Sequence, residues 1–396
     1  MANNAFPTTD EDIDAVRPET LKERIDDGES VFILDVRATE EFDQWHIDGE
    51  TVETENVPYF EFLMDEDDDS LYEGLPDDQE IVVLCAKGGS SEYIASLLKA
   101  RGFTVSHLES GMNGWASIYD YTELDTETDA TIAQYQRPSS GCLAYLVVSG
   151  DEAAVIDPLR AFADEYVADA RAMGAELKYA VDTHIHADHI SGVRTLARET
   201  GATAVIPAAA ADRGVEYDDA YETVEDGDEL MVGDVTIDAI HTPGHTSGMT
   251  SYEVGDVLFT GDTLFTESVA RPDLEDGAEG AEDAAKLLYD SLADRILTRD
   301  PDSLVAPAHF SDAATQAADG TYTARLGALE TSMDALSMAR DEFVSFILSD
   351  MPPRPANYED IIAANLGVED VDDAEAFALE LGPNNCAASQ DALTSN

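Results

Sequence analysis

The segment "AVDTHIHADHISGV" (residues 180–193) constrains the fold most, because it places three histidines and two aspartates directly after an apolar run. The whole chain contains eight histidines, and three of them lie within six positions here. Imidazole and carboxylate groups together suit zinc, iron or manganese better than calcium or magnesium. Functional groups commonly lie on loops that a rigid scaffold positions. The segment therefore predicts a buried strand that ends in a metal-binding loop.

Three later segments repeat this pattern of an apolar run followed by a polar loop. "AIHTPGH" carries His241 and His245, "FTGDTLF" carries Asp262, and "APAHF" carries His309. For a single histidine, an ordinary hydrogen-bonded loop residue would be the better explanation. The segments in this order instead favour one metal centre assembled from several strand ends.

The charge of the chain indicates a folded protein adapted to high salt. Its 396 residues include 85 Asp plus Glu against 21 Lys plus Arg, a net charge of -64, yet 44% of the residues are hydrophobic. A disordered acidic chain would be poorer in apolar residues. At about 1 M salt the Debye length falls to roughly 3 Å, so the self-repulsion is screened. We expect a halophilic, haloarchaeal protein that is a poor partner for nucleic acid and for anionic membranes.

The termini and cysteines add expectations about the compartment. The first twenty residues lack the basic start and apolar core of a signal peptide, and no apolar run approaches the ~20 residues that span a bilayer, which predicts a cytoplasmic protein. The three cysteines are far apart and odd in number, which argues against a disulfide framework. Cys142, in "GCLAYLVV", is expected to be a strand residue. Cys386 is expected to be structural, with a place along a substrate path as the alternative.

The first part of the chain, residues 1–120, has the alternation of a small α/β domain. Residues 30–37 and 80–86 are predicted as buried strands, and residues 91–102 as an amphipathic helix that stops at glycine. Such alternation favours a parallel sheet. A polar, acidic stretch follows, and we predict a linker at residues 121–129.

The second part of the chain changes to paired strands and then to helices. From residue 130 two apolar runs flank a Gly-Asp turn, a helix is predicted at residues 161–173, and a further strand delivers the histidine cluster. We predict a metal-binding domain at residues 130–320. A helical extension is expected at residues 321–396.

Over about residues 130–312, the four histidine and aspartate segments resemble the metallo-β-lactamase superfamily. This resemblance implies an αββα sandwich of the α/β class with its metal site at one edge. His241 matches no ligand of the family and is expected to be structural. Position by position, the resemblance implies a first metal site of His184, His186 and His245, bridged by Asp262, and a second of Asp188, His189 and His309.

Two branches of this superfamily differ in metal and chemistry. A two-metal site, often zinc, activates water for thioester hydrolysis, as in the glyoxalase II type. A single Fe(2+) held by two histidines and a carboxylate is the facial triad of oxygenases, and here that triad would be His184, His245 and Asp262. The loop "SVARPDLE", with Arg271 and Asp273, resembles the persulfide dioxygenases, in which this pair is a candidate for a catalytic role. The tail "MPPRPANYEDIIAANLG" also resembles persulfide dioxygenase-like proteins fused to rhodanese domains.

The segment "CAKGGSS", together with "LDVRATEEFDQWHIDGE", resembles the rhodanese family over roughly residues 15–118. In that family the cysteine carries sulfane sulfur, so Cys85 is the candidate nucleophile. Loop amides and a helix N-terminus would stabilise its thiolate. The sequence departs from the family because Ala86 and Ser90 replace arginines of the loop and Lys87 is its one cation. A buried structural cysteine is the alternative.

Together these resemblances predict a non-haem iron persulfide dioxygenase that acts on a low-molecular-weight thiol persulfide. A metal-dependent thioester hydrolase with zinc or a dinuclear centre is the first alternative. A sulfur carrier whose metal is only structural is the second, although structural zinc sites are usually closed. The predicted partner is a small molecule, and a homo-oligomer is compatible with the sequence.

Overall fold

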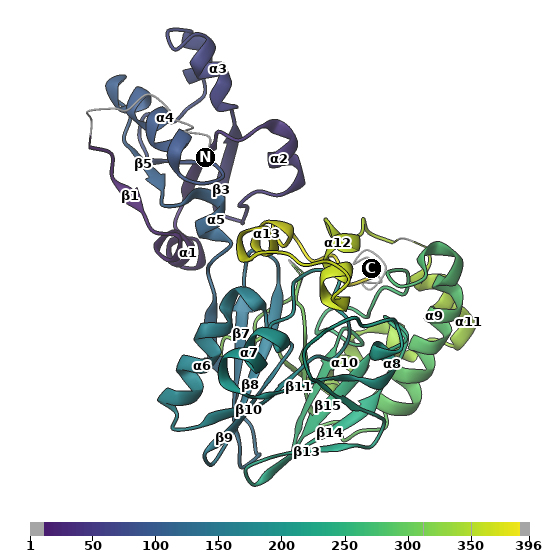
Figure 1. The fold of residues 1–396 in the computed structure, drawn as a ribbon. Helices are drawn as coiled ribbons and strands as arrows, with labels where there is room; N and C mark the ends of the chain where they lie inside the picture. The colour runs from purple at the N-terminus through teal and green to yellow at the C-terminus, as the bar shows by residue number, and fades with distance from the viewer. Residues whose placement is uncertain (1–11, 312, 350, 389–396) are drawn as a thin grey trace. The chain divides into compact units, whose positions relative to one another are not determined.

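The computed structural model describes residues 12–311, 313–349 and 351–388. The chain divides into two compact units, Met1–Ile118 and Tyr119–Asn396, and each is described by itself (Figure 1).

The first unit is built on a five-stranded parallel sheet with the order β1-β5-β4-β2-β3. Separate apolar cores lie against its two faces, which explains why β4 is apolar at every position and β2 at every position except its last, Asp35. The predicted strands and helix of this region are confirmed as β2, β4 and α4. The elements are β1 (Ala15–Val16), α1 (Pro18–Asp26), β2 (Val31–Asp35), α2 (Thr39–Gln44), β3 (Val52–Asn56), α3 (Tyr59–Met64), η1 (Asp69–Tyr72), β4 (Ile81–Leu84), α4 (Gly89–Ala100), β5 (Val105–Leu108) and α5 (Gly111–Trp115).

The second unit contains two sheets. The first, mixed sheet has the order β12-β11-β10-β9-β8-β7-β6. Its strands and the helices between them are β6 (Asp120–Glu123), β7 (Thr131–Arg137), β8 (Cys142–Ser149), β9 (Glu152–Ile156), η2 (Arg160–Phe162), α6 (Ala163–Ala172), β10 (Glu176–Val181), α7 (Val193–Thr200), β11 (Thr203–Pro207), α8 (Ala208–Ala211) and β12 (Glu222–Val224).

The other sheet has the order β13-β14-β15-β16-β17-β18, and helices follow it. Its elements are β13 (Glu229–Val232), β14 (Val235–His241), β15 (Thr250–Val254), β16 (Val257–Gly261), α9 (Gly277–Ser291), η3 (Leu292–Ile296), β17 (Leu304–Pro307) and β18 (Ala324–Arg325). The C-terminal helices are α10 (Leu326–Ser332), η4 (Asp334–Ser337), α11 (Arg340–Ile347), α12 (Tyr358–Leu366) and α13 (Asp373–Leu379).

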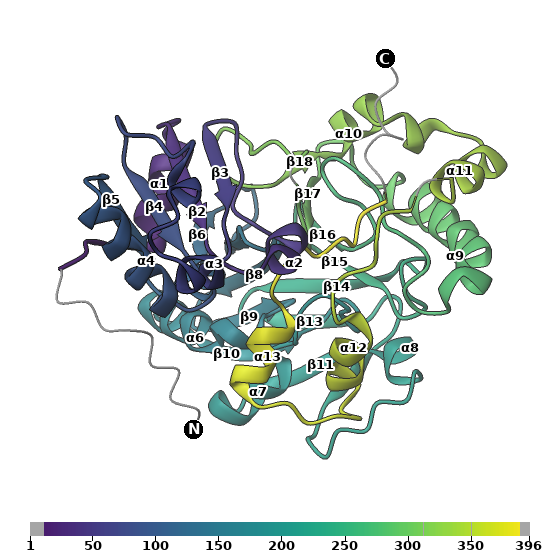
Figure 2. The same ribbon diagram turned by 90° about the horizontal axis from the view of Figure 1, so that it is seen from above.

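Three cores give this unit four layers, so the expected αββα sandwich is confirmed. The inner core joins residues of both sheets, such as Tyr145 and Phe259. A second core packs α6 and α7 on the outer face of the first sheet. The third packs α9, α10 and α11 on the outer face of the other sheet, as Figure 2 shows. Part of the expected helical extension is therefore a layer of the sandwich.

Residues 121–123, at the start of the predicted linker, belong to strand β6 (Asp120–Glu123). This strand pairs antiparallel with β7 and lies at the edge of the sheet. The ring of Tyr121 also packs edge-on against Tyr135, with 5.4 Å between their centroids. The pairing with β7 and this ring contact keep the segment in a strand although its composition is polar, so the linker prediction is wrong for these residues.

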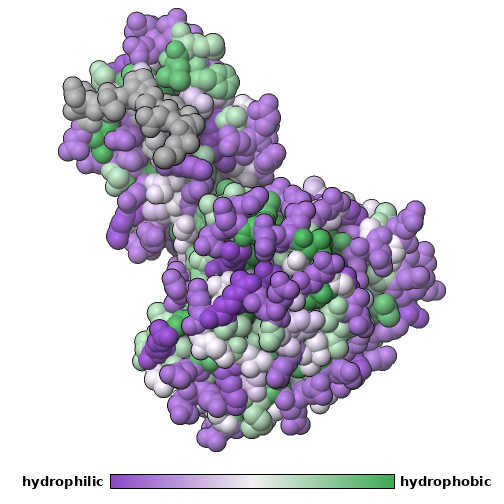
Figure 3. Space-filling view, viewed as in Figure 1, coloured by the Kyte–Doolittle hydropathy of each residue, from purple (hydrophilic) through white to green (hydrophobic). Residues whose placement is uncertain are grey.

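The surface agrees with the acidic composition. On the face shown in Figure 3, hydrophilic residues predominate over scattered apolar ones. Among the described residues, no helix has both the length and the apolar character needed to cross a bilayer.

Candidate metal centre and cysteine site

Loops from both sheets carry the predicted ligands to one edge of the sandwich. Strand β10 leads into the loop of residues 182–192. Strands β16 and β17 are parallel neighbours, so Asp262 and His309 emerge side by side from their carboxyl ends. At this edge Cys142 forms a bridge with His309, which joins the two sheets. Residues from distant parts of the chain thus meet in one place.

The glycine of the "FTGD" segment permits this approach. Gly261 has a φ of +50°, and a Cβ at this position would lie 2.2 Å from Met249 Cε and 2.8 Å from Thr183 Oγ1. A side chain would therefore clash with the neighbouring loop. The absence of one lets β16 end against the strand end that carries the histidine loop.

His184, His245 and Asp262 make up what we call the first ligand group. Their side chains are buried, and His184 Nε2 and His245 Nε2 lie 3.6 and 3.3 Å from Asp262 Oδ2. None of these three atoms has a hydrogen-bond partner among the described residues. Buried polar atoms are normally paired, so three converging unpaired atoms fit a metal ion. Two imidazoles and one carboxylate are the donor set of a facial triad.

Hydrogen bonds to the far sides of the two imidazoles orient them as ligands. Thr183 Oγ1 donates to Asp157 over 3.0 Å and so accepts from His184 Nδ1 over 2.9 Å. His245 Nδ1 donates to the carbonyl oxygen of Arg271 over 2.9 Å. A proton on each Nδ1 leaves the lone pair of Nε2 for a metal.

The protonation states of the first ligand group also suit metal binding. Burial lowers the pKa of His184 and His245, so both imidazoles are neutral at physiological pH. Burial opposes ionisation of Asp262, but His309, together with His245 and His184, outweighs it and holds the pKa of this carboxyl below its usual range. Neutral imidazoles and a carboxylate are the protonation states that metals require.

Cys142, Asp188, His189 and His309 make up the second ligand group, whose ligand atoms all lie within 4.8 Å of one another. Asp188 Oδ2 is 2.7 Å from His309 Nε2 and 3.0 Å from His189 Nδ1. Two further atoms, Asp188 Oδ1 and His189 Nε2, are buried without a described partner. The structure therefore brings together the three residues of the predicted second site and adds a thiol that the sequence did not assign to it.

His186 lies between the two groups. Its ring centroid is 4.2 Å from that of His184 and 4.1 Å from that of His189. Its Nε2 is 3.1 Å from Asp157 Oδ1, whereas its Nδ1 is buried without a described partner. His186 Nδ1 is therefore also a candidate ligand atom. His241, as expected, is apart from both groups and bonds the carbonyl oxygen of Ser247.

Cys386 also reaches the centre, although the sequence favoured a structural residue there. Its thiol lies with Asp262 and His309 in a buried cluster whose ligand atoms are within 4.8 Å of one another. Burial, followed by the charges of Asp188 and Asp262, raises the pKa of this thiol well above its usual value. In the absence of a metal it is therefore a neutral thiol beside the first ligand group.

The C-terminal segment holds the metal loop by its backbone. Asn365 Nδ2 donates to the carbonyl oxygens of His186 and His189, over 3.0 and 2.7 Å, and its Oδ1 accepts from Ser191 N over 2.9 Å. Glu380 accepts from the backbone nitrogen of Ile190 over 2.8 Å. The sequence did not predict a role for Asn365 or Glu380, because contacts between distant segments leave no local signal in it.

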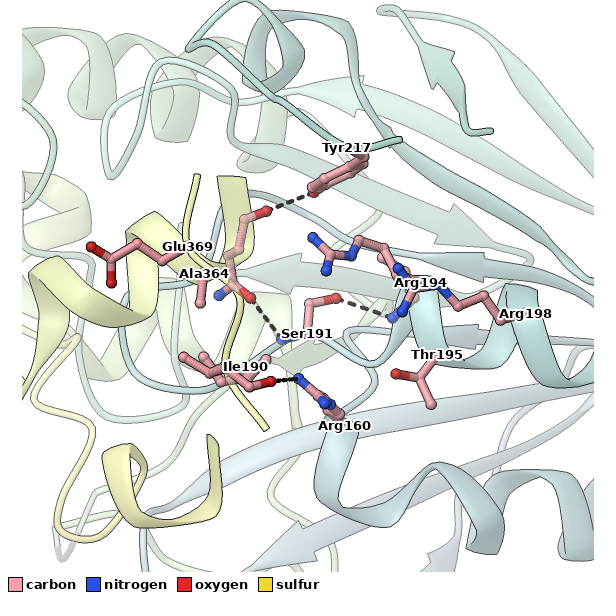
Figure 4. A pocket seen from close by; sticks show the side chains of 12 residues that line it. Arg160, Ile190, Ser191, Arg194, Thr195, Arg198, Tyr217, Ala364 and Glu369 are labelled. Atoms are coloured by element: carbon pink, nitrogen blue, oxygen red, sulfur yellow. Dashed lines mark hydrogen bonds between the residues drawn. The ribbon is translucent and has the colours of Figure 1, made fainter. Parts of the chain in front are cut away.

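A pocket lies behind the metal loop between α7 and the C-terminal segment (Figure 4). Tyr217 closes one side and donates to the carbonyl oxygen of Asn365 over 2.7 Å. Three arginines line the pocket and all are ion-paired: Arg160 with Asp373, and Arg194 and Arg198 with Asp219. The residues that line this pocket thus include Asn365, which supports the metal loop.

Arg271 is buried, with 1% of its surface exposed, and its guanidinium is fully engaged. It makes two bonds to Asp273, of 2.7 and 3.1 Å. Its remaining donors bond the carbonyl oxygens of Pro352, Pro353 and Asn385. Because all five donors are used, this side chain connects the ligand-bearing loop to the C-terminal segment.

Cys85 lies in the first unit, directly after β4 and before α4. The backbone N–H of Gly88 donates to its Sγ over 3.0 Å, and Ser91 Oγ is 3.4 Å away. Burial disfavours the thiolate, but hydrogen bonding with Ser90, Ser91 and the loop backbone outweighs this effect and lowers the pKa of Cys85. The side chain of Lys87 is exposed and makes no described hydrogen bond to the thiol. The loop is built to stabilise negative charge on sulfur.

Two family models match the chain. One, described as the metallo-beta-lactamase superfamily, matches residues 138–309, and the other, a rhodanese-like domain, matches residues 17–118. The human protein "Persulfide dioxygenase ETHE1, mitochondrial" is 30% identical over 242 residues, which cover 59% of this chain and 87% of that protein.

Two crystal structures resemble part of this chain. ETHE1 from Myxococcus xanthus matches with a TM-score of 0.52 and 28% identity, over 60% of this chain and 98% of that chain. A metallo-beta-lactamase from Staphylococcus aureus matches with a TM-score of 0.55 and 26% identity, over 60% of this chain and 72% of that chain.

Proposed function

Because this chain belongs to the metallo-beta-lactamase superfamily as a homologue of persulfide dioxygenase ETHE1, with a rhodanese-like domain preceding the sandwich, we propose that it oxidises a thiol persulfide to sulfite. The coarser conclusion is that it is a metal-dependent enzyme. The reaction proposed is RSSH + O2 + H2O to RSH + H2SO3, in which the outer sulfur is oxidised and dioxygen is reduced. R is a low-molecular-weight thiol.

The observation that carries this proposal is the first ligand group. His184 Nε2, His245 Nε2 and Asp262 Oδ2 converge without partners among the described residues. An iron ion bound there would supply the redox chemistry that couples sulfur to dioxygen and would keep three coordination positions free. The residues around it supply orientation and a water-poor setting, because all three ligand side chains are buried.

We assign Arg271 and Asp273 to positioning the centre. The carbonyl oxygen of Arg271 fixes the His245 ring, while its side chain fixes the C-terminal segment. A direct contact with substrate would require this guanidinium to give up existing bonds. The pair would thus act on catalysis through the geometry of His245.

Cys85 is proposed to carry sulfane sulfur. Its lowered pKa favours the thiolate, and the hydrogen bonds that stabilise a thiolate would equally stabilise a persulfide anion. Sulfur would pass from this cysteine to the small thiol that the metal centre uses, or sulfite would be taken onward to thiosulfate. Because Ala86 and Ser90 replace the arginines of the Cys85 loop, the use of thiosulfate as a sulfur donor is less supported than the acceptance of sulfur from a persulfide.

The second ligand group favours one competing function. Two metals in adjacent groups would suit a thioester hydrolase of the glyoxalase II type. To separate the functions, metal-free protein in high salt is loaded with Fe(2+) or Zn(2+) and given a thiol persulfide and a thioester in parallel. Oxygen uptake with sulfite formation by the iron form supports the proposal. Thioester cleavage without oxygen uptake would replace it with the hydrolase.

A further inference from the structure

The side chains of the first ligand group are closed off from solvent. At most 1% of the surface of His184, His245 and Asp262 is exposed. A molecule as large as a thiol therefore cannot reach these ligands in the conformation observed. Part of the protein around the centre has to move before a substrate can bind, and the thinnest part of the cover is the candidate.

Residues 384–388, which we call the strap, form a thin part of this cover. Asn384, Cys386 and Ala388 are buried, whereas Asn385 and Ala387, which alternate with them, are half-buried. The strap therefore has one side toward the interior and the other toward solvent. Because the inward thiol of Cys386 reaches the ligands, a single layer of chain separates the centre from solvent here.

Hydrogen bonds hold the strap on both sides of the centre. On one side, Asn384 bonds the carbonyl oxygen of Ser140, in the turn between β7 and β8, through its backbone nitrogen over 3.2 Å and through its side-chain amide. On the other side, Ala388 N donates to the carbonyl oxygen of Val269 over 2.9 Å. Strand β8 belongs to the first sheet, and Val269 follows β16 of the other. The strap thus crosses from one sheet to the other over the metal edge.

The strap is also connected to a ligand through Arg271. The backbone nitrogen of Arg271 donates to the carbonyl oxygen of Cys386 over 3.2 Å, and its own carbonyl oxygen accepts from His245 Nδ1. The buried apolar side chains of the strap, Cys386 and Ala388, are both small. Segments held by a few hydrogen bonds and little apolar burial open locally, at a lower free energy than global unfolding.

We propose that the strap is a gate to the metal centre. Residues 384–388 separate from Ser140 and from the loop of residues 269–271 to admit a small-molecule substrate, and they close over it to exclude water. The gate concerns access to the ligands, so the inference stands whichever reaction occurs at them.

A reversible lock tests the gate in the full-length protein. Ala270 and Ala387 are opposite each other in an isolated antiparallel bridge. The backbone bonds of the strap flank this pair, so it is a non-hydrogen-bonded pair, in which opposed side chains lie closest. Cysteines at both positions should therefore form a disulfide on oxidation with diamide and release it with dithiothreitol. Mass spectrometry of peptides verifies this pairing against the native cysteines.

Alkylation of the buried Cys142 by iodoacetamide, in metal-free protein at high salt, measures the opening. The locked form of Ala270→Cys/Ala387→Cys should react about tenfold more slowly at Cys142 than the reduced form. Cys85, in the other unit, is the internal control and should react at one rate in both forms. The iron-loaded locked protein should also lose persulfide turnover and regain it on reduction.

A loosened strap should have the opposite effect. Asn384→Ala should raise the alkylation rate of Cys142 about tenfold, because the closed strap loses the two hydrogen bonds of this side chain. Asn357→Ala is the matched control, since Asn357 is exposed in the same C-terminal segment and bonds the carbonyl oxygen of Leu379. Circular dichroism checks that each variant is folded.

Two results would overturn the gate. One is an equal alkylation rate of Cys142 in the locked and reduced forms, and the other is an equal rate in Asn384→Ala and Asn357→Ala. Slower alkylation in the locked form, with no persulfide turnover in either form, would support the gate while it contradicts the proposed reaction.

Discussion

Asn365 donates a hydrogen bond of 2.7 Å to the carbonyl oxygen of His189, although 176 positions separate the two residues. The same amide side chain bonds the carbonyl oxygen of His186 and the backbone nitrogen of Ser191. A single side chain of α12 thus holds the loop that contains the ligands at three points, from its middle to its C-terminal end. The C-terminal segment is part of the metal centre's framework.

Asn365→Ala is expected to weaken metal binding about tenfold, because residues that orient ligands typically contribute this much to affinity. The affinity is measured by competition with a metal chelator. Asp360→Ala is the matched control, since Asp360 is exposed on the same helix and makes no described contact with the loop. An unchanged affinity in folded Asn365→Ala would show that the loop keeps its shape without this residue.

Arg271→Met is expected to lower the free energy of unfolding by about 3 kcal/mol, because three carbonyl oxygens of the C-terminal segment lose their donor and Asp273 keeps only its pair with Arg354. Denaturant titration at constant high salt measures this loss. Arg340→Met is the control, because its pair with Asp290 is about half exposed and should contribute less than about 1 kcal/mol. Equal stability of the two variants would contradict the connecting role of Arg271.

Cys85 is expected to react with an alkylating reagent at lower pH than an ordinary thiol, because its pKa is lowered. The thiolate fraction rises as the pH passes the pKa, so a lower pKa moves the rate profile toward acid. Replacing both Ser90 and Ser91 with alanine removes stabilising hydroxyls and should move the midpoint back upward. Peptide-resolved mass spectrometry follows Cys85 separately from the buried Cys142 and Cys386. A midpoint that does not move would mean that the backbone alone stabilises the thiolate.

Low salt is expected to unfold the protein. A net charge of -64 with few basic residues leaves self-repulsion that only a short Debye length suppresses. Circular dichroism during dialysis from molar to millimolar salt measures the loss, and a sorbitol solution of equal osmolality controls for osmotic effects. A spectrum that stays constant throughout would refute the adaptation to high salt.

The predicted ligands could be found in the sequence because the chemistry is local. His184, His186, Asp188 and His189 lie on one loop, and Asp262 and His309 follow strands whose parallel pairing places them together. The sandwich followed from the same segments through their family resemblance. The paired strands of β7 to β9 also have a strong local signal in their alternation and turn.

Contacts between distant segments could not be predicted in this way. Cys142 has the surroundings of an ordinary strand residue in the sequence. Its contact with Asp188 arises because the start of β8 and the loop after β10 lie at the same edge of one sheet. Glu380 occurs among many acidic residues, so nothing in the sequence distinguishes it from the charged surface. Its burial beside Arg137, at 2.6 Å, results from the packing of the C-terminal segment.

The central claim is that the first ligand group holds an iron ion that oxidises persulfide sulfur. The most direct test records oxygen consumed and sulfite formed by the iron-loaded protein with a thiol persulfide in high salt. The account predicts one sulfite for each dioxygen, and neither product formation nor uptake in Asp262→Ala or His245→Ala. An iron-loaded, folded protein that consumes no oxygen would contradict it.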